Sequence, residues 1–285
     1  MKLLLIAVFV ALAGVGCGSS PGPASGNEAP QPAVNSPIPV QTAAAKGKEK
    51  IGTAELKIAA PSGKGTLKGV AKYAGTETVL PPKALPADSH AACHGKEVPD
   101  ESLIVEPKTQ GIQGIMVRIM NVEFKDPLPK PATLPQIDQK GCIFAPHVVI
   151  VPPGTDLEVL NPQGVSHSFK TVGVDFLNPE RNVMIPASMP KYVYPGKDLS
   201  QPEIVQVTCA VHSWMKAYIL VNDPRSCAVT GADGAFEIKE LPAGKYKLNI
   251  WHEKLAYYKG QEFHTVEIKP GQTTDMGELK FEPKK

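Results

Sequence analysis

The chain has 285 residues, of which 42% are hydrophobic and 6% aromatic, and its 30 lysines and arginines face 28 aspartates and glutamates. This length predicts one or two domains. A net charge of +2 leaves no concentrated basic face to neutralise phosphates, so nucleic acid is excluded as an expected partner. The 29 prolines favour turns and strands over helices, and we expect an all-β protein.

Residues 1–17 have the layout of a bacterial export signal. Lys2 is followed by an apolar run, and small residues lead from this run to Cys17. The run is too short for a membrane-spanning helix. The segment ending at Cys17 resembles a lipobox, although Gly14 stands where such motifs usually carry leucine. The resemblance implies acylation of Cys17 and a lipid-anchored protein of the periplasm or cell envelope, with plain secretion as the alternative.

Residues 18–63 are rich in proline, alanine, serine and glycine, and large apolar residues are rare among them. Such a composition cannot bury enough surface to fold. We expect a disordered tether here, joining Cys17 to a folded head.

From residue 64 onward, short β-branched runs alternate with proline and glycine, as in sandwiches and barrels. The runs expected to form strands are 66–73, 115–122, 148–151, 157–160, 204–209 and 218–221. The alternation in 204–209 places Val205, Val207 and Cys209 on one face, so that the Cys209 side chain is expected to point into the core.

A second unit is expected at 224–285. Asp233-Gly234 lies between two strand-like runs, which is a strong hairpin signal. The pattern VTGADGAFEI…LPAGKYKLNIWHE resembles the carboxypeptidase-regulatory-like, transthyretin-like β-sandwich modules. Residues 65–70 resemble the opening strand of such modules, and if the module takes that strand, the central domain is an insertion. The sequence leaves this alternative open.

Residues 209–215 read Cys-x-x-His-x-x-Met, a spacing that can bring a thiolate, an imidazole and a thioether to one metal ion. Copper suits these donors, since soft sulfur favours Cu(I) and imidazole suits Cu(II). A second imidazole is expected from His167, which follows the predicted strand 157–160.

Asn161, His167 and the Cys-x-x-His-x-x-Met loop together resemble the cupredoxins, and the short loop is most similar to that of the amicyanins. The stretches IDQKGCIFAPHV, NPQGVSHSF and CAVHSWM, followed by the module that contains WHE, resemble exported bacterial proteins of the plastocyanin-like or methylamine-utilisation-like kind. The resemblance implies a Greek-key sandwich at 64–223 that holds one type 1 copper. It implies His167, Cys209 and His212 as ligands, Met215 as the axial ligand, and Asn161 as a residue that supports the site. Trp214 lies between two of these ligands in the sequence, so we expect it to shield the metal from water, with a place on an electron path as the alternative.

Cys17 and Cys209 then have other roles, and we expect a disulfide between Cys93 and Cys142, with Cys142–Cys227 as the next alternative. A dinuclear copper site would need a second cysteine on the ligand loop, and covalent haem would need Cys-x-x-Cys-His. The remaining candidate ligands are expected to be structural: His147, His252, His90 and His94.

The leading hypothesis is a one-electron carrier or copper-binding module that is not an enzyme, since no hydrolase or metalloprotease motif is present. The redox partner protein is not identifiable from the sequence. Two alternatives stay open. One is a structural or adhesive envelope protein, and the other is a protein that captures or delivers copper.

Overall fold

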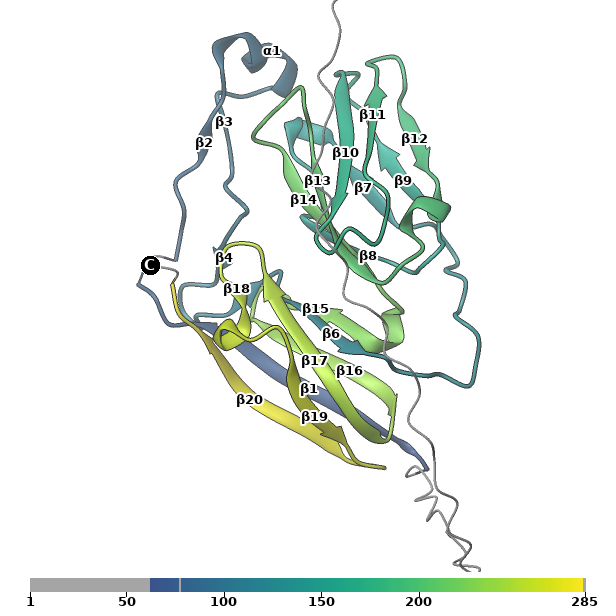
Figure 1. The fold of residues 1–285 in the computed structure, drawn as a ribbon. Helices are drawn as coiled ribbons and strands as arrows, with labels where there is room; N and C mark the ends of the chain where they lie inside the picture. Colours follow the sequence, from purple (N-terminus) through teal and green to yellow (C-terminus); the bar gives the residue numbers. More distant parts are fainter. Residues whose placement is uncertain (1–61, 77, 284–285) are drawn as a thin grey trace, which may run out of the picture. The chain divides into compact units, whose positions relative to one another are not determined.

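The computed structural model describes residues 62–76 and 78–283, which form twenty strands, one short α-helix and five 3-10 helices (Figure 1). The expected export signal, Cys17 and nearly all of the expected tether therefore lie outside the described residues. Those described belong to one unit, Leu56–Lys285. They form an all-β fold of two sandwiches, and among them no helix is long and apolar enough to cross a membrane.

The first sandwich consists of two sheets that share one apolar core. The larger sheet has the order β11-β10-β13-β14-β8, with β11 (Arg181–Ile185), β10 (His167–Gly173), β13 (Glu203–Thr208), β14 (Lys216–Val221) and β8 (Val148–Val151). The smaller sheet has the order β12-β9-β7, with β12 (Lys191–Tyr194), β9 (Leu157–Leu160) and β7 (Gln136–Asp138).

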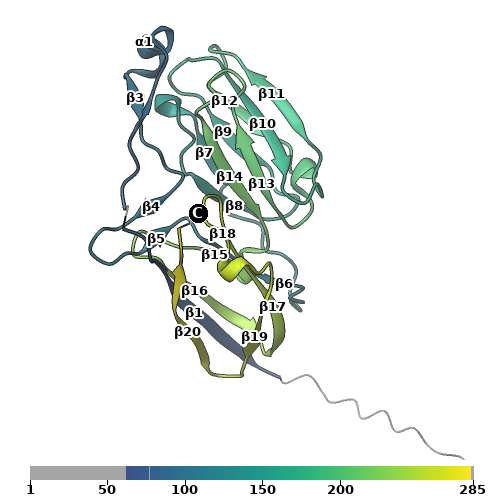
Figure 2. The ribbon, with the colours of Figure 1, turned by 60° about the vertical axis from the view of Figure 1, so that its left-hand side comes forward.

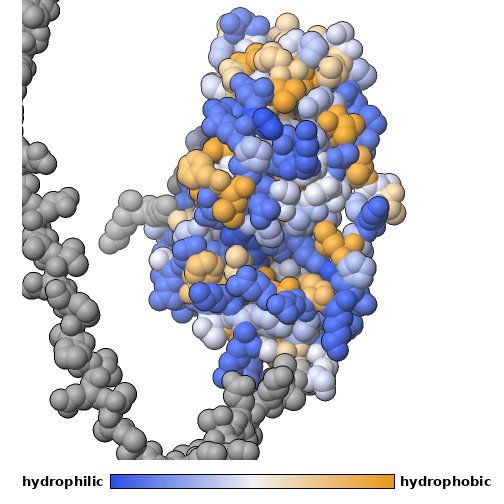
Figure 3. Space-filling model, turned by 45° about the vertical axis from the view of Figure 1, so that its right-hand side comes forward, coloured by the Kyte–Doolittle hydropathy of each residue, from blue (hydrophilic) through white to orange (hydrophobic). Residues whose placement is uncertain are grey.

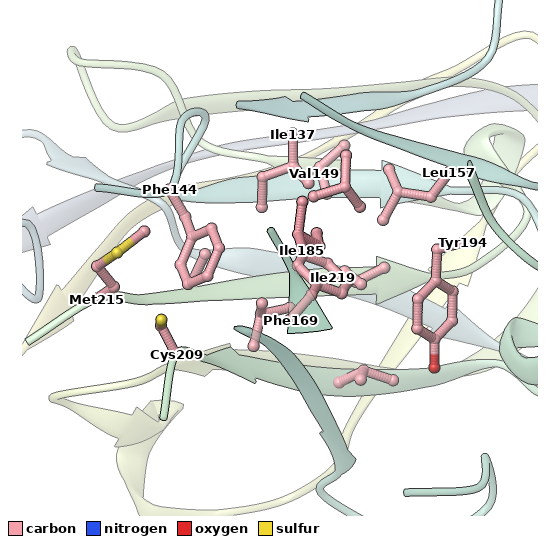
Figure 4. Close-up of a cluster of buried hydrophobic side chains, with 14 of the residues drawn as sticks. Ile137, Phe144, Val149, Leu157, Phe169, Ile185, Tyr194, Cys209, Met215 and Ile219 are labelled. Carbon is pink, nitrogen blue, oxygen red and sulfur yellow. The ribbon is translucent and has the colours of Figure 1, made fainter. Parts of the chain in front are cut away.

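Alternation along β13 positions the core of this sandwich. Val205, Val207 and Cys209 are buried in it as the sequence predicts. Figure 4 shows Cys209 and Met215 at one end of this core and Tyr194 towards the other. Ile204, on the opposite face of β13, is also buried, because it packs with Met116 and Cys227 in a separate cluster between the two sandwiches.

The second sandwich also consists of two sheets around one core. One sheet has the order β16-β1-β20, with β16 (Ala235–Pro242), β1 (Lys64–Tyr73) and β20 (Thr273–Phe281). The other has the order β15-β6-β17-β18 with β19 paired to β17, and its strands are β15 (Cys227–Val229), β6 (Met116–Met120), β17 (Gly244–His252), β18 (Ala256–Tyr257) and β19 (His264–Ile268).

The strand pairing differs from the expected division into 64–223 and 224–285. β1 pairs with β16 and β20, and β6 pairs with β15 and β17. Both early strands thus complete sheets of the second sandwich, and the first sandwich is inserted between β6 and β15, as the insertion alternative has it. The expected division assigned consecutive segments of the chain to the same domain. Strand pairs between segments far apart in the sequence set the actual domains.

The prediction of a hairpin around Asp233-Gly234 is also wrong. Gly234 does adopt a positive φ of 79° in a tight turn, where the Gly234 N–H donates to the Gly231 carbonyl at 2.9 Å. The strands on either side pair with different partners, β15 with β6 and β16 with β1. The turn is therefore an arch that joins the two sheets.

An arm leaves the second sandwich after β1 and reaches the first one (Figure 2). It contains a two-stranded ladder of β2 (Lys83–Ala84) and β3 (Glu97–Val98), and between them the helix α1 (His90–Cys93). The chain returns through β4 (Ile104–Val105) and β5 (Ile112–Gln113). Leu85, Cys93 and Val98 of the arm are buried in the core of the first sandwich.

Apolar side chains are scattered among polar ones over the coloured face in Figure 3. Scattered apolar residues are normal on a protein surface. That face accordingly offers no continuous apolar patch.

Candidate metal centre

Three side chains from distant segments converge at one end of the first sandwich. His167 opens β10, while Cys209 and His212 lie in the loop between β13 and β14. The Nδ1 atoms of the two imidazoles are 3.0 Å apart, and the Cys209 Sγ lies 3.8 Å from the His212 Nδ1. One potential ligand atom of each residue lies within 4.8 Å of the others, so the three form a group that could hold one metal ion.

All three side chains are nearly excluded from solvent, with exposed fractions of 1% for His167, 3% for Cys209 and 6% for His212. Burial, helped by the neighbouring His212, lowers the pKa of His167 to about 4. Burial also lowers the pKa of His212. At neutral pH both imidazoles are therefore uncharged, which is the form that binds metal.

The Cys209 sulfur accepts two backbone hydrogen bonds. The N–H groups of Ser168 and His212 both donate to Sγ at 3.3 Å. These two donors hold the sulfur in a fixed position. Ser168 also links the two ligand segments, because its Oγ accepts the Ala210 N–H at 2.6 Å.

Backbone hydrogen bonds close the ligand loop tightly. The Met215 N–H donates to the His212 carbonyl at 2.9 Å, and the Cys209 N–H donates to the Met215 carbonyl at 3.4 Å. Met215 is 1% exposed and shares its core with Phe144. The thioether is thus buried at the same end of the core as the Cys209 sulfur (Figure 4).

Asn161 and Trp214 stabilise the segments next to the His167–Cys209–His212 group. The Asn161 side-chain amide donates to the carbonyls of Val165 and Pro186, at 2.8 and 3.3 Å, and so braces the loop that leads to His167. The Trp214 ring lies 5.1 Å from the His212 ring, centroid to centroid, and its indole N–H donates to the Cys142 carbonyl at 3.1 Å.

Cys93 and Cys142 are bonded to each other, with a Cα–Cα distance of 5.2 Å. Cys227, the alternative partner of Cys142, is unbonded and buried, and burial raises the pKa of its thiol to about 12. The alternative pairing is therefore absent from the structure.

The histidines expected to be structural have partners away from the His167–Cys209–His212 group. His147 contacts Glu253, and the His90 ring contacts the Leu85 carbonyl at 3.0 Å. His252 accepts the Lys254 N–H at 3.2 Å, and His94 caps α1 in a left-handed conformation.

Sequence reasoning missed Ser168. Its role depends on a backbone N–H, which every residue except proline carries, and its contact with Cys209 crosses 41 positions of the chain. No local signal could have identified it, beyond its place directly after His167.

The donors fit a copper ion. Two neutral imidazoles and one hydrogen-bonded sulfur converge, and a thioether lies nearby in an apolar setting. Imidazole and thiolate donors of this kind suit copper.

No protein-family model matches the chain, and no curated protein matches it. Among solved structures, amicyanin from Paracoccus versutus is 14% identical, covering 39% of this chain and 99% of its own, with a TM-score of 0.27. A purple cupredoxin from Nitrosopumilus maritimus is 14% identical over 31% of this chain and 99% of its own, with a TM-score of 0.26.

The copper-containing nitrite reductase from Thermus scotoductus SA-01 is 21% identical over 36% of this chain, with a TM-score of 0.25. The match spans 25% of that reductase.

Proposed function

We propose that this chain is an exported type 1 copper protein that carries single electrons and is not itself an enzyme. The observation that carries the proposal is the convergence of the His167 and His212 Nδ1 atoms on a Cys209 sulfur that already accepts two N–H groups. A copper ion held there supplies the one-electron couple between Cu(II) and Cu(I).

The residues of the chain would do three things for that couple. His167, Cys209 and His212 would bind the ion, and Met215 would be a weak axial donor. The Ser168 and His212 N–H groups hold the sulfur in place, and Asn161 holds the approach to His167. Burial excludes water from the donors, so the site needs little rearrangement when the charge of the ion changes.

The test is a visible spectrum of the full chain after addition of one equivalent of Cu(II). We expect one bound copper and an intense thiolate-to-copper band, and we expect Cys209→Ser to lose that band. Cys227→Ser is the matched control, because Cys227 is a buried thiol in a different cluster. A band that survives in Cys209→Ser, or a colourless wild type, would rule the proposal out in favour of a structural role or of copper capture and delivery.

Tethering to a membrane is part of the same proposal and rests on Cys17. An acylated Cys17 should carry the protein into the membrane fraction, from which detergent but not high salt releases it. The redox partner is proposed to be another exported protein. Wild-type protein found wholly in the soluble exported fraction, with an unmodified N-terminus, would contradict the anchor without affecting the copper assignment.

A further inference from the structure

A second group of donors lies against the proposed copper centre and shares one residue with it. Cys93 Sγ, Cys142 Sγ and a ring nitrogen of His212 all lie within 4.8 Å of one another. The three residues are 4%, 0% and 6% exposed. They come from the arm, from the segment before β8 and from the ligand loop, so only the tertiary structure brings them together.

Cys142 is held in place by contacts other than the disulfide. Its carbonyl accepts the Trp214 indole N–H at 3.1 Å. The preceding Gly141 donates its N–H to the Gln163 side chain. Cleavage of the S–S bond therefore leaves the Cys142 side chain beside the ligand loop.

Cys93 is likewise held by the arm that carries it. The apolar side chains of Leu85 and Val98 are buried in the first sandwich, and the Leu85 N–H donates to the Lys96 carbonyl at 2.8 Å. A salt bridge of 3.0 Å joins Lys83 to Asp100 across the base of the arm. These contacts keep the arm against the core when the disulfide is open.

We propose that reduction of the Cys93–Cys142 disulfide creates a second metal site, in which the two thiols and His212 bind a soft monovalent ion such as Cu(I). Soft thiolate sulfurs favour Cu(I), and imidazole is a common copper ligand. The bound thiols lose their protons to solvent as the ion enters. This inference goes beyond the proposed electron-transfer function.

A phosphine can supply the two electrons that the reduction requires. A water-soluble phosphine breaks the S–S bond and is oxidised to its phosphine oxide, whose oxygen comes from water, while the two hydrogens of that water go to the two sulfurs. In the cell, a dithiol reductant would supply the same two electrons and two protons and would itself become a disulfide.

The shared His212 joins the second site to the proposed copper centre. The donors of the proposed copper centre are nearly inaccessible to solvent. An ion held by the two thiols would lie directly beside them. The second site would therefore hold Cu(I) next to the proposed copper centre.

The experiment uses the full chain carrying Cys209→Ser, in which the proposed copper centre has lost its thiolate. The protein is reduced with the phosphine, freed of it by anaerobic desalting, and titrated with Cu(I) against a coloured Cu(I) chelator. We expect the reduced variant to bind one equivalent of Cu(I) more than its disulfide-bonded form. Adding Cys93→Ser should weaken that binding at least about tenfold, since even loss of a residue that only orients a ligand costs about that much.

Two further variants separate ligand loss from general damage. His212→Ala in the Cys209→Ser chain should also lose the added equivalent, whereas His147→Ala, which changes a histidine outside the group, should keep it. Equal Cu(I) uptake by the reduced and disulfide-bonded forms, or uptake that does not depend on Cys93, would overturn the proposal. So would collapse of the far-ultraviolet circular dichroism on reduction, because the donors would then no longer be held together. None of these results depends on the colour of the Cu(II)-loaded wild type, so this inference and the proposed function can fail separately.

Discussion

The backbone N–H of Ser168 donates to the sulfur of Cys209 at 3.3 Å, and the Ser168 hydroxyl oxygen lies 3.9 Å from the same sulfur. Ser168 thus presents two polar groups, its N–H and its hydroxyl, to the Cys209 sulfur. The electrostatic setting of the sulfur is one of the features that tune a copper–thiolate potential.

Ser168→Ala removes the hydroxyl and leaves the backbone N–H in place. We expect the variant to bind copper and stay coloured, with a lower reduction potential, because less positive partial charge faces the thiolate in the Cu(I) state. A hydrogen bond is worth about 1 kcal/mol, which for one electron corresponds to about 40 mV. Voltammetry of the copper-loaded protein measures the shift, and an unchanged or higher potential would contradict the assigned role.

Met215→Leu removes the thioether but keeps an apolar side chain of similar volume in a position that is 1% exposed. Copper and colour should persist and the potential should rise, because a weak axial donor stabilises Cu(II) more than Cu(I). Metal analysis and voltammetry test this together. Complete loss of copper would mean that Met215 is a principal ligand.

Deletion of residues 224–285 should produce insoluble protein. The deletion removes β16 and β20, both partners of β1, and also β15 and β17, both partners of β6. Unpaired strand edges promote aggregation. Sedimentation and the yield of soluble protein measure the outcome, and a soluble copper-binding product would show that the first sandwich folds without these strand pairs.

The metal-free protein should lose stability as the pH falls from about 6.5 to about 4. Burial lowers the pKa of both His167 and His252 to about 4, whereas the unfolded chain takes up these protons near pH 6.5. Between these values the unfolded state binds more protons, so each histidine costs up to about 3 kcal/mol of folding free energy. Urea unfolding at several pH values measures the loss.

The copper-loaded protein provides the comparison for that titration. Bound metal competes with the proton at His167 but not at His252, which lies outside the group. The pH dependence of stability should therefore be steeper with copper than without it over the same range, because unfolding releases the metal and the freed ligands then take up protons. Identical curves would mean that His167 is not a ligand.

The sequence alone determined the part of the site that a short stretch of chain can specify. Cys209, His212 and Met215 lie within one loop whose spacing is local, and the alternation of Val205, Val207 and Cys209 follows from the geometry of a strand. The all-β class likewise follows from local strand and turn preferences. Such features depend on neighbouring residues and can be read along the chain.

Only the tertiary structure decided which distant segments meet. The N–H of Ser168 on the Cys209 sulfur, the disulfide beside His212 and the pairing of β1 with β16 and β20 all join residues far apart in the sequence. Local strand preferences alone do not select which strands pair with β1. The choice among them depends on the apolar surface that the whole arrangement buries, and that quantity belongs to the folded chain as a whole.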